Sequence, residues 1–204
     1  MSDIHGVILA GGLARRMGGG DKPLADLSGR PILAHVIDRL SPQCAGLALN
    51  ANGDPARFAG FGLPVVADSV EGFAGPLAGV LAGMDDAASV GAAWLISAPG
   101  DTPFLPGDLV PRLAAARNAA GVEIAVASSG GRTHHAVALW PTALRNALRR
   151  ALTLEGERKV SSFIARYSSV IVDWPVEPND PFFNVNRPED LERAKAMAKE
   201  EARG

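Results

Sequence analysis

The stretch LAGGLARRMGGGDKPL, residues 9–24, combines small residues and cations in a pattern suited to a polyphosphate ligand. Its five glycines let backbone N–H groups approach a ligand closely, and Arg15, Arg16 and Lys22 supply positive charge beside them. It lacks GxxxxGK[ST], and it lacks GxGxxG followed by an acid about 20 residues on, so it is neither a P-loop nor a dinucleotide fingerprint. We therefore predict a nucleotide-binding loop of another kind; the alternative is a flexible glycine turn with solvated charges.

Three further polar residues follow apolar runs directly: Asn50 after LAL, Asp68 after PVVA, and Asp101 after WLISAPG. In an open α/β sheet, ligands bind beyond the carboxyl ends of the strands, so we expect these residues to converge with the glycine-rich stretch at one edge. Mg²⁺ is typically bound by one or two carboxylates plus substrate phosphates, which makes Asp101 a candidate metal ligand. The alternative for Asp101 is a turn or helix-cap residue, and Asp68 is open to the same alternative.

The elements that must position these residues follow from the hydrophobic pattern. Many strand-like runs show no polar alternation, which is typical of strands covered on both faces, and several helical patterns open with proline in the first turn. The pattern predicts a single α/β domain, residues 1–204, built as a three-layer sandwich with a mostly parallel, Rossmann-like sheet and one antiparallel member near its end. Expected strands are residues 6–10, 46–50, 63–67, 92–98, 123–128 and 136–140, and expected helices are residues 31–41, 76–88, 106–119, 141–152, 159–167 and 188–202.

The composition excludes several classes of function. With 204 residues, 47% of them apolar, and a formal net charge of −2, the chain lacks the basic stripe of a general nucleic-acid binder. No uncharged stretch reaches the roughly 20 residues of a membrane span, and the first residues lack the basic flank of a signal peptide. The single Cys44 and four histidines show no zinc-ligand spacing, so we expect a protein of the reducing cytoplasm.

Taken together, the motifs resemble the molybdenum cofactor guanylyltransferase family. The resemblance runs from residue 9 to residue 191 and is carried by residues 9–24, Asn50-Ala51-Asn52, Asp68, GPLAG at 75–79, PGDTPF at 99–104 and FNVNRPEDL at 183–191. It implies a fold like that of nucleotide-diphospho-sugar transferases. It also implies transfer of GMP from GTP, with Mg²⁺, to the terminal phosphate of molybdopterin or Mo-molybdopterin, releasing pyrophosphate. The doubled Gly11-Gly12 favours this family over the cytidylyltransferases, which usually show LAAG, whereas Arg187 stands where the family often has Thr.

The resemblance also implies roles for individual residues. Backbone groups of the first loop would contact the nucleotide, Asn50 and Asp68 would hold its base and ribose side, and Asp101 would bind magnesium. Catalysis by positioning and charge neutralisation would fall to Lys22, Asp101 and one arginine of the loop. The residues implied are Leu9, Ala10, Gly11, Gly12, Arg15, Lys22, Asn50, Asp68 and Asp101.

The second substrate leaves a fainter pattern. Arg132, His134 and His135 precede the apolar run AVALW, and in a regular strand the two histidines would face opposite sides. They are either a strand-edge pair or residues that hold the pterin. Arg158 and Lys159 are either a solvated face or ligands of the pterin phosphate, and Asn184 and Asn186 either belong to a turn and cap or bind the pterin. Trp94, Trp140 and Met84 are interpreted as core residues.

Two other functions remain open on the sequence. One is a related nucleotidyltransferase, either a cytidylyltransferase that uses CTP as the donor for the same pterin or an enzyme that acts on another small phosphorylated acceptor. The other is a non-catalytic nucleotide-binding adapter, which would meet other maturation proteins and the recipient enzymes of the cofactor. Lys22 and Asp101 argue against the adapter, because a binding module could lose a metal ligand.

Overall fold

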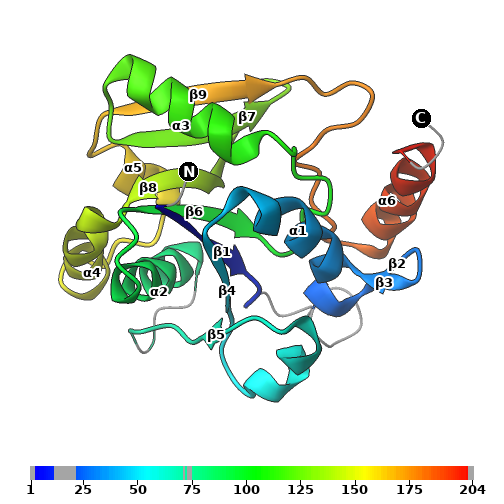
Figure 1. Cartoon of the computed structure of the whole chain (residues 1–204), viewed down its shortest axis with the longest axis horizontal. Helices are drawn as coiled ribbons and strands as arrows, with labels where there is room; N and C mark the ends of the chain where they lie inside the picture. Colours follow the sequence, from blue (N-terminus) through cyan, green and yellow to red (C-terminus); the bar gives the residue numbers. More distant parts are fainter. Residues whose placement is uncertain (1–2, 12–21, 71, 73–74, 202–204) are drawn as a thin grey trace.

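The computed structural model describes residues 3–11, 22–70, 72 and 75–201. In this part of the chain, one sheet carries seven strands in the order β5-β4-β1-β6-β8-β7-β9 (Figure 1). All of them run parallel except β8, which lies antiparallel to both β6 and β7, so the predicted mostly parallel sheet is confirmed. The strands are β1 Ile4–Leu9, β4 Gly46–Asn50, β5 Val65–Val66, β6 Trp94–Pro99, β7 Ile124–Ser129, β8 Arg132–Pro141 and β9 Ser169–Trp174.

Helices cover both faces of this sheet and complete the predicted three layers (Figure 1). On β1, Val7 belongs to the core cluster beneath α2, α4 and α5, whereas its neighbour Ile8 belongs to the cluster beneath α1 and α3. Successive strand residues point to opposite faces, so a strand covered twice must be apolar throughout. The helices are α1 Ile32–Leu40, α2 Pro76–Ser89, α3 Leu109–Ala120, α4 Arg145–Thr153 and α5 Val160–Ile164, with short 3₁₀ turns at Lys22–Leu24, Ser41–Gln43, Pro55–Phe61 and Thr142–Leu144.

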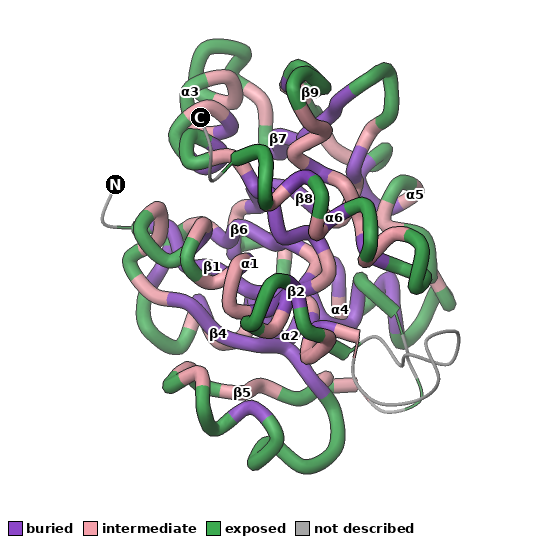
Figure 2. The backbone as a smooth tube through the Cα atoms, turned by 90° about the vertical axis from the view of Figure 1, so that its right-hand side faces the viewer, coloured by how far each residue is buried: buried purple, intermediate pink, exposed green. Residues whose placement is uncertain are grey.

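The last helix, α6 (Pro188–Glu201), lies outside these layers against the hairpin of β2 (Asp26–Leu27) and β3 (Arg30–Pro31). It buries Ala194 and Met197 in a third, smaller core cluster that also contains Phe104 and Val185. This packing anchors residues 183–187, which precede the helix, near the end of β6. The tube coloured by burial shows buried strands at the centre and exposed turns around them (Figure 2).

Two glycines one turn apart bring α2 unusually close to the sheet. A Cβ at Gly79 would stand 2.3 Å from Oδ1 of Asn50 and 2.7 Å from Cδ2 of Leu9, and one at Gly83 would stand 2.6 Å from Cγ1 of Val7. No side chain fits at such distances, so the helix can approach the strands only because both residues lack one. As a result, the start of α2 reaches the carboxyl ends of β1 and β4.

The sheet departs from the sequence-based prediction in three places. The β2–β3 hairpin, which turns through Ser28 (φ 57°) and Gly29 (φ 87°), was not predicted. Residues 170–181 were expected to mix a short strand with three prolines and to cross the surface, and the strand is β9 (Ser169–Trp174), six residues long and paired with β7 at the end of the sheet. Strand β8 begins at Arg132 rather than at residue 136, because a tight turn at Gly130 and Gly131, both with positive φ, pairs it with β7 from its first residue.

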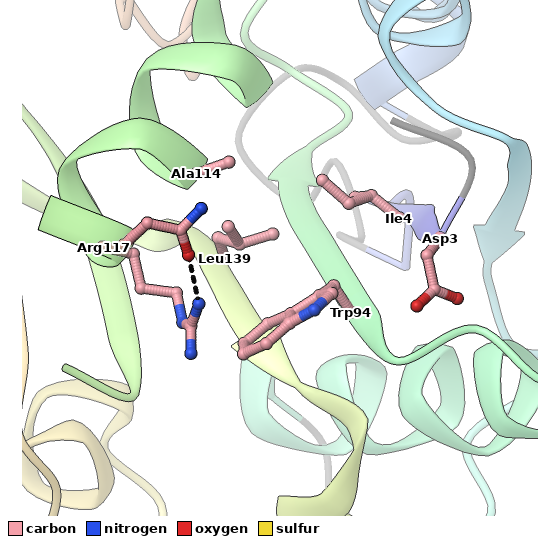
Figure 3. Close-up of a pocket in the computed structure, with 7 residues that line it drawn as sticks. Asp3, Ile4, Trp94, Ala114, Arg117 and Leu139 are labelled. Carbon is pink, nitrogen blue, oxygen red and sulfur yellow. Dashed lines mark hydrogen bonds between the residues drawn. The ribbon is translucent and has the colours of Figure 1, made fainter. Parts of the chain in front are cut away.

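A hollow of about 300 Å³ lies at the amino ends of β1 and β6, away from their carboxyl ends (Figure 3). There the guanidinium of Arg117, on α3, lies 3.8 Å from the ring centroid of Trp94 and donates a 2.6 Å hydrogen bond to Oδ1 of Asn118. Trp94 is therefore half-buried, whereas Trp140 and Met84 lie fully in the core as predicted. None of the described helices combines the length and the hydropathy needed to cross a membrane.

Candidate functional site

A cleft of about 250 Å³ opens where β1, β4, β5 and β6 end. Parallel strands deliver their carboxyl ends to the same edge of the sheet, and a polar residue follows or ends three of these four strands. The structure thus brings Leu9, Gly11, Asn50, Asp68 and Asp101 together, as predicted. The cleft is lined by Leu9, Gly11, Asn50, Asn52, Asp68, Gly75, Pro76, Pro99, Asp101 and Ala136.

Asn50, Asn52 and Asp68 form one hydrogen-bonded cluster on the β4–β5 side of the cleft. The carboxylate of Asp68 accepts from Nδ2 of Asn50 at 2.9 Å and from Nδ2 of Asn52 at 2.8 Å, and its own backbone N–H donates to Oδ1 of Asn52 at 2.9 Å. Asn50 is 5% exposed, and its Nδ2 also donates a hydrogen bond to the carbonyl of Val66. The cluster fixes the Asp68 carboxylate as a preformed acceptor for ligand hydroxyl or N–H groups.

On the other side of the cleft, Asp101 is held by the segment that precedes α6. Its Oδ1 accepts from Nδ2 of Asn184 at 2.9 Å, and its backbone carbonyl accepts from the N–H of Val185 at 2.9 Å. Burial raises the pKa of the Asp101 carboxyl above its ordinary value, and the Asn184 hydrogen bond and the charge of Lys22 oppose that rise. A desolvated carboxylate with a cation nearby is typical of functional sites.

Lys22 is positioned by the same segment, since its Nζ donates to Oδ1 of Asn186 at 2.9 Å. Asn184 and Asn186 alternate around the buried Val185, so one extended stretch ties Asp101 and Lys22 together. Sequence reasoning offered a turn or the pterin as their role and missed these two contacts. The alternation Asn-Val-Asn indicates an extended segment with both amides on one side. The hydrogen-bond partners of these amides, however, lie 83 and 164 residues away in the sequence.

Of the glycine-rich stretch, residues 9–11 and 22–24 belong to the described part of the chain. Leu9 and Gly11 line the cleft, whereas Ala10 is fully buried and its N–H donates to the carbonyl of Asn50 at 2.8 Å. The carbonyl of Leu9 accepts from the N–H of Gly100 at 3.0 Å, so these bonds join the loop to β4 and to the turn after β6. Gly12, Arg15 and Arg16 lie outside the described residues, and their predicted contacts stay predictions.

The amino terminus of α2 also borders the cleft, through Gly75 and Pro76. The first N–H groups of a helix have no partner within it, and the helix dipole favours negative charge at this end. The GPLAG motif at residues 75–79 starts this helix, and the sequence alone predicted no role for it in the site. The helix adds a partial positive charge to the side of the cleft that faces Asn50.

A second hollow, of about 240 Å³, adjoins the first and shares Pro99 and Ala136 with it. Its lining includes both His134 and His135, within a run of six consecutive residues of β8. The expectation that the two side chains face opposite sides stays a prediction. Between the pairs Val126–Ala138 and Ala127–His134, three residues of β8 have no partner on β7, and such a bulge breaks the alternation of side chains. The hollow is lined by Pro99, Thr102, Arg132, Thr133, His134, His135, Ala136, Val137, Phe182 and Asn184.

Arg158 and Lys159 are not brought to either hollow. They stand at the start of α5, where their N–H groups both donate to Oε1 of Glu157 at 2.9 Å. In the described chain, no group of three or more His, Cys, Asp or Glu side chains gathers to hold a metal. The metal-binding role expected of Asp101 stays a prediction.

Comparison with known proteins agrees with this geometry. The family described as MobA-like NTP transferase domain matches residues 6–170. A molybdenum cofactor guanylyltransferase of Rhodopseudomonas palustris is 62% identical over 97% of this chain and 95% of its own length, and one of a Bradyrhizobium species is 58% identical over 98% and 95%. These relatives confirm the resemblance predicted from the motifs.

Solved structures share the fold at low identity. Molybdopterin-guanine dinucleotide biosynthesis protein A of Archaeoglobus fulgidus superposes with a TM-score of 0.75 at 23% identity, covering 96% of this chain and 99% of its own. A Mycobacterium tuberculosis protein, solved as a complex with manganese, gives a TM-score of 0.66 at 19% identity over 95% and 98%. The fold, the cleft and the full-length relatives agree: this chain belongs to the family of MobA-like NTP transferase domains.

Proposed function

We propose that this chain transfers GMP from GTP to the terminal phosphate of molybdopterin or Mo-molybdopterin. A phosphate oxygen of the acceptor attacks the α-phosphorus of GTP, and pyrophosphate leaves with the electrons of the broken bond, which yields the guanine dinucleotide and conserves all atoms. The single observation that supports this best is the 62% identity over nearly the whole chain to a protein named molybdenum cofactor guanylyltransferase.

The two adjoining hollows suit a reaction with two substrates. They meet at Pro99 and Ala136, and Asp101 lines the first while its partner Asn184 lines the second. We assign the nucleotide to the cleft bordered by Gly11, Asn50 and Asp68, and the acceptor to the hollow beside β8. The reacting phosphates would then meet at the carboxyl end of β6, where Asp101 stands.

Asp101 would suit a Mg²⁺ site in which the phosphate oxygens of the substrate provide the other ligands. Among the described residues, Asn184 is the one side chain that donates a hydrogen bond to this carboxylate. Mg²⁺ commonly binds one or two carboxylates, phosphate oxygens and water, so a single aspartate in a cleft matches its preference. The manganese complex of the mycobacterial neighbour supports a divalent cation in this fold.

The residues of the chain act mainly by positioning and by charge. A divalent cation, when bound, supplies electrostatic stabilisation of the charge on the phosphates. Lys22, tied to Asn186, adds a positive charge to the same region, and Asp68 with its two asparagines orients the nucleoside. No general base is required, because the attacking phosphate is already an anion near neutral pH.

The decisive experiment incubates the protein with molybdopterin, Mg²⁺ and either GTP or CTP, and measures pyrophosphate and the dinucleotide product. The proposal expects product with GTP at a much higher kcat/KM than with CTP. Preference for CTP would make the chain a cytidylyltransferase, and tight binding of GTP without pyrophosphate release would make it an adapter. The same preparation can be tested against other maturation proteins and recipient enzymes, with which we expect it to work in the cytoplasm.

A further inference from the structure

We propose that His134 is a specificity-determining residue of the acceptor hollow, and that its unpaired Nδ1 accepts a hydrogen bond from an N–H group on the edge of the acceptor's heterocycle. This inference rests on the proposed function only in naming that heterocycle a pterin. It concerns a side chain to which sequence reasoning gave two open roles, and it follows from the direction of two hydrogen bonds.

A short chain of hydrogen bonds fixes the tautomer of His134. The hydroxyl of Ser129 donates its single proton to Oδ1 of Asp180 at 2.7 Å, and a carboxylate can only accept it. The same hydroxyl lies 2.8 Å from Nε2 of His134 and has no second proton to give. Nε2 must therefore carry the proton and donate it to Ser129, which leaves Nδ1 of the neutral ring as an acceptor.

Nδ1 is left without a partner although the side chain is almost enclosed. His134 is 9% exposed, and Ser129 provides its only hydrogen bond within the described residues. The single fully buried side-chain nitrogen or oxygen without a partner in that part of the chain is Nε of Arg117, at the far edge of the sheet. Nδ1 of His134 is therefore not fully enclosed by the protein, and His134 is one of the residues that line the hollow assigned to the acceptor.

The ring is also held rigidly, as a recognition group should be. It packs against Phe182, with ring centroids 4.8 Å apart, and Phe182 in turn meets Trp174 edge-on at 5.4 Å. Asp180, which ends the hydrogen-bond chain, accepts from the backbone N–H of Phe182 at 3.0 Å. The imidazole cannot rotate to present Nε2 to a ligand without breaking the bond to Ser129.

The charges around the ring favour its neutral form. Desolvation lowers the pKa of His134 below its ordinary value; Arg132 and His135 lower it further, and only Asp180 raises it. At neutral pH the ring therefore offers Nδ1 as an acceptor. Protonation would turn Nδ1 into a donor that repels an N–H group.

This arrangement selects a class of ligand. The edge of a pterin ring carries N–H and amino donors, and the ring would bind more weakly if such a donor were desolvated without an acceptor opposite it. A ring that presents only acceptors at this point would meet the lone pair of Nδ1 and be rejected. His134 thus distinguishes a ring that presents a hydrogen-bond donor at this point from one that presents an acceptor. Arg132, which lines the same hollow, can bind anionic groups.

Two substitutions separate this role from a structural one. In His134→Gln the amide nitrogen takes the place of Nε2 and can still donate to Ser129, but nothing stands in the place of Nδ1. In His134→Asn the carbonyl oxygen takes the place of Nδ1, and the bond to Ser129 is lost. The probes are free pterin and pterin with its exocyclic nitrogen dimethylated and N3 methylated, and binding is followed by pterin fluorescence, which requires no turnover.

The wild type should bind pterin roughly 5-fold to 100-fold more tightly than the methylated probe. His134→Gln should lose that preference with Tm little changed and GTP affinity unaltered, whereas His134→Asn should keep most of it at a lower Tm. Pterin binding by the wild type should weaken as pH falls through the lowered pKa of His134, and His134→Gln should show no such dependence.

Equal binding of the two probes by the wild type would overturn the proposal, as would an undiminished preference in His134→Gln, even if His134→Asn fails to fold. Failure of the proposed function would look different. The wild type would then discriminate between the probes and yet release no pyrophosphate from GTP and molybdopterin.

Discussion

Replacing Asp101 by Asn should separate the stability of this protein from its activity. The substitution removes a charge but keeps an oxygen that can accept the 2.9 Å hydrogen bond from Asn184. Because burial raises the pKa of Asp101, the folded state binds the proton more readily than the unfolded state does. The contribution of Asp101 to stability therefore falls as pH rises through the unfolded-state pKa to the raised one, and above that range the carboxylate destabilises the fold.

The expected changes in stability and in kcat follow from the environment of Asp101. Relief of the desolvated charge should raise the free energy of unfolding at neutral pH by about 0.5–1 kcal/mol, a Tm increase of about 1–4 °C for a domain of this size. Loss of the metal ligand should remove about 3–5 kcal/mol of charge stabilisation from the transition state, which lowers kcat by about 10²–10⁴-fold.

Thermal unfolding with and without Mg²⁺ and GTP measures the change in stability, and pyrophosphate release measures the change in kcat. Asp108→Asn is the matched control, because Asp108 accepts from Nε1 of Trp174 at 3.0 Å, away from the cleft, and should leave kcat unchanged. The wild type should gain thermal stability from Mg²⁺ with GTP, and Asp101→Asn should gain much less. A variant that retains more than a tenth of wild-type turnover, or that is less stable than the wild type in the absence of metal, would refute this reasoning.

Three other substitutions test the remaining parts of the cleft. Gly79→Ala should destabilise the protein by about 1–3 kcal/mol and weaken GTP binding, because its Cβ would displace Asn50; Gly83→Ala, whose Cβ meets only Val7, should destabilise similarly in chemical denaturation but keep GTP affinity. Lys22→Ala should weaken GTP binding about tenfold and leave guanosine binding unchanged by calorimetry, and an equal loss for both would remove it from the phosphates. Asn52→Ala frees one oxygen of Asp68 and should raise the KM for GTP several-fold with Tm nearly constant, whereas an unchanged KM would exclude the cluster from nucleotide binding.

The parts of the fold that could be predicted are those whose signal is local. β1 and β6 are apolar on both faces, and α2 opens with proline, so pattern alone located them to within a few residues. Asp101 could be predicted because a polar residue after a buried parallel strand must reach the functional edge. What these elements share is that each depends on its own sequence and on the general rules of sheet packing.

The parts that escaped prediction depend on contacts between distant residues. The bulge in β8 has no periodic signature, although it interrupts the pairing of this strand directly after His134. The hydrogen bonds of Asn184 and Asn186 become visible only once α6 anchors their segment beside β6. The β2–β3 hairpin has strands of two residues each, too short for any alternation to be read.

The reversed direction of β8 has a consequence for how this enzyme could diversify. Because β8 runs against its neighbours, its first residues rather than its last arrive at the functional edge, carried by a two-glycine turn on a paired and therefore stiff hairpin. The cleft that we assign to the nucleotide is lined mostly by residues before 102, and the hollow that we assign to the acceptor is lined mostly by residues after 131. Replacing the tip of this hairpin would thus change which molecule receives the nucleotide, while the choice of nucleotide stays the same. Two separate parts of the chain would then determine the two substrate specificities.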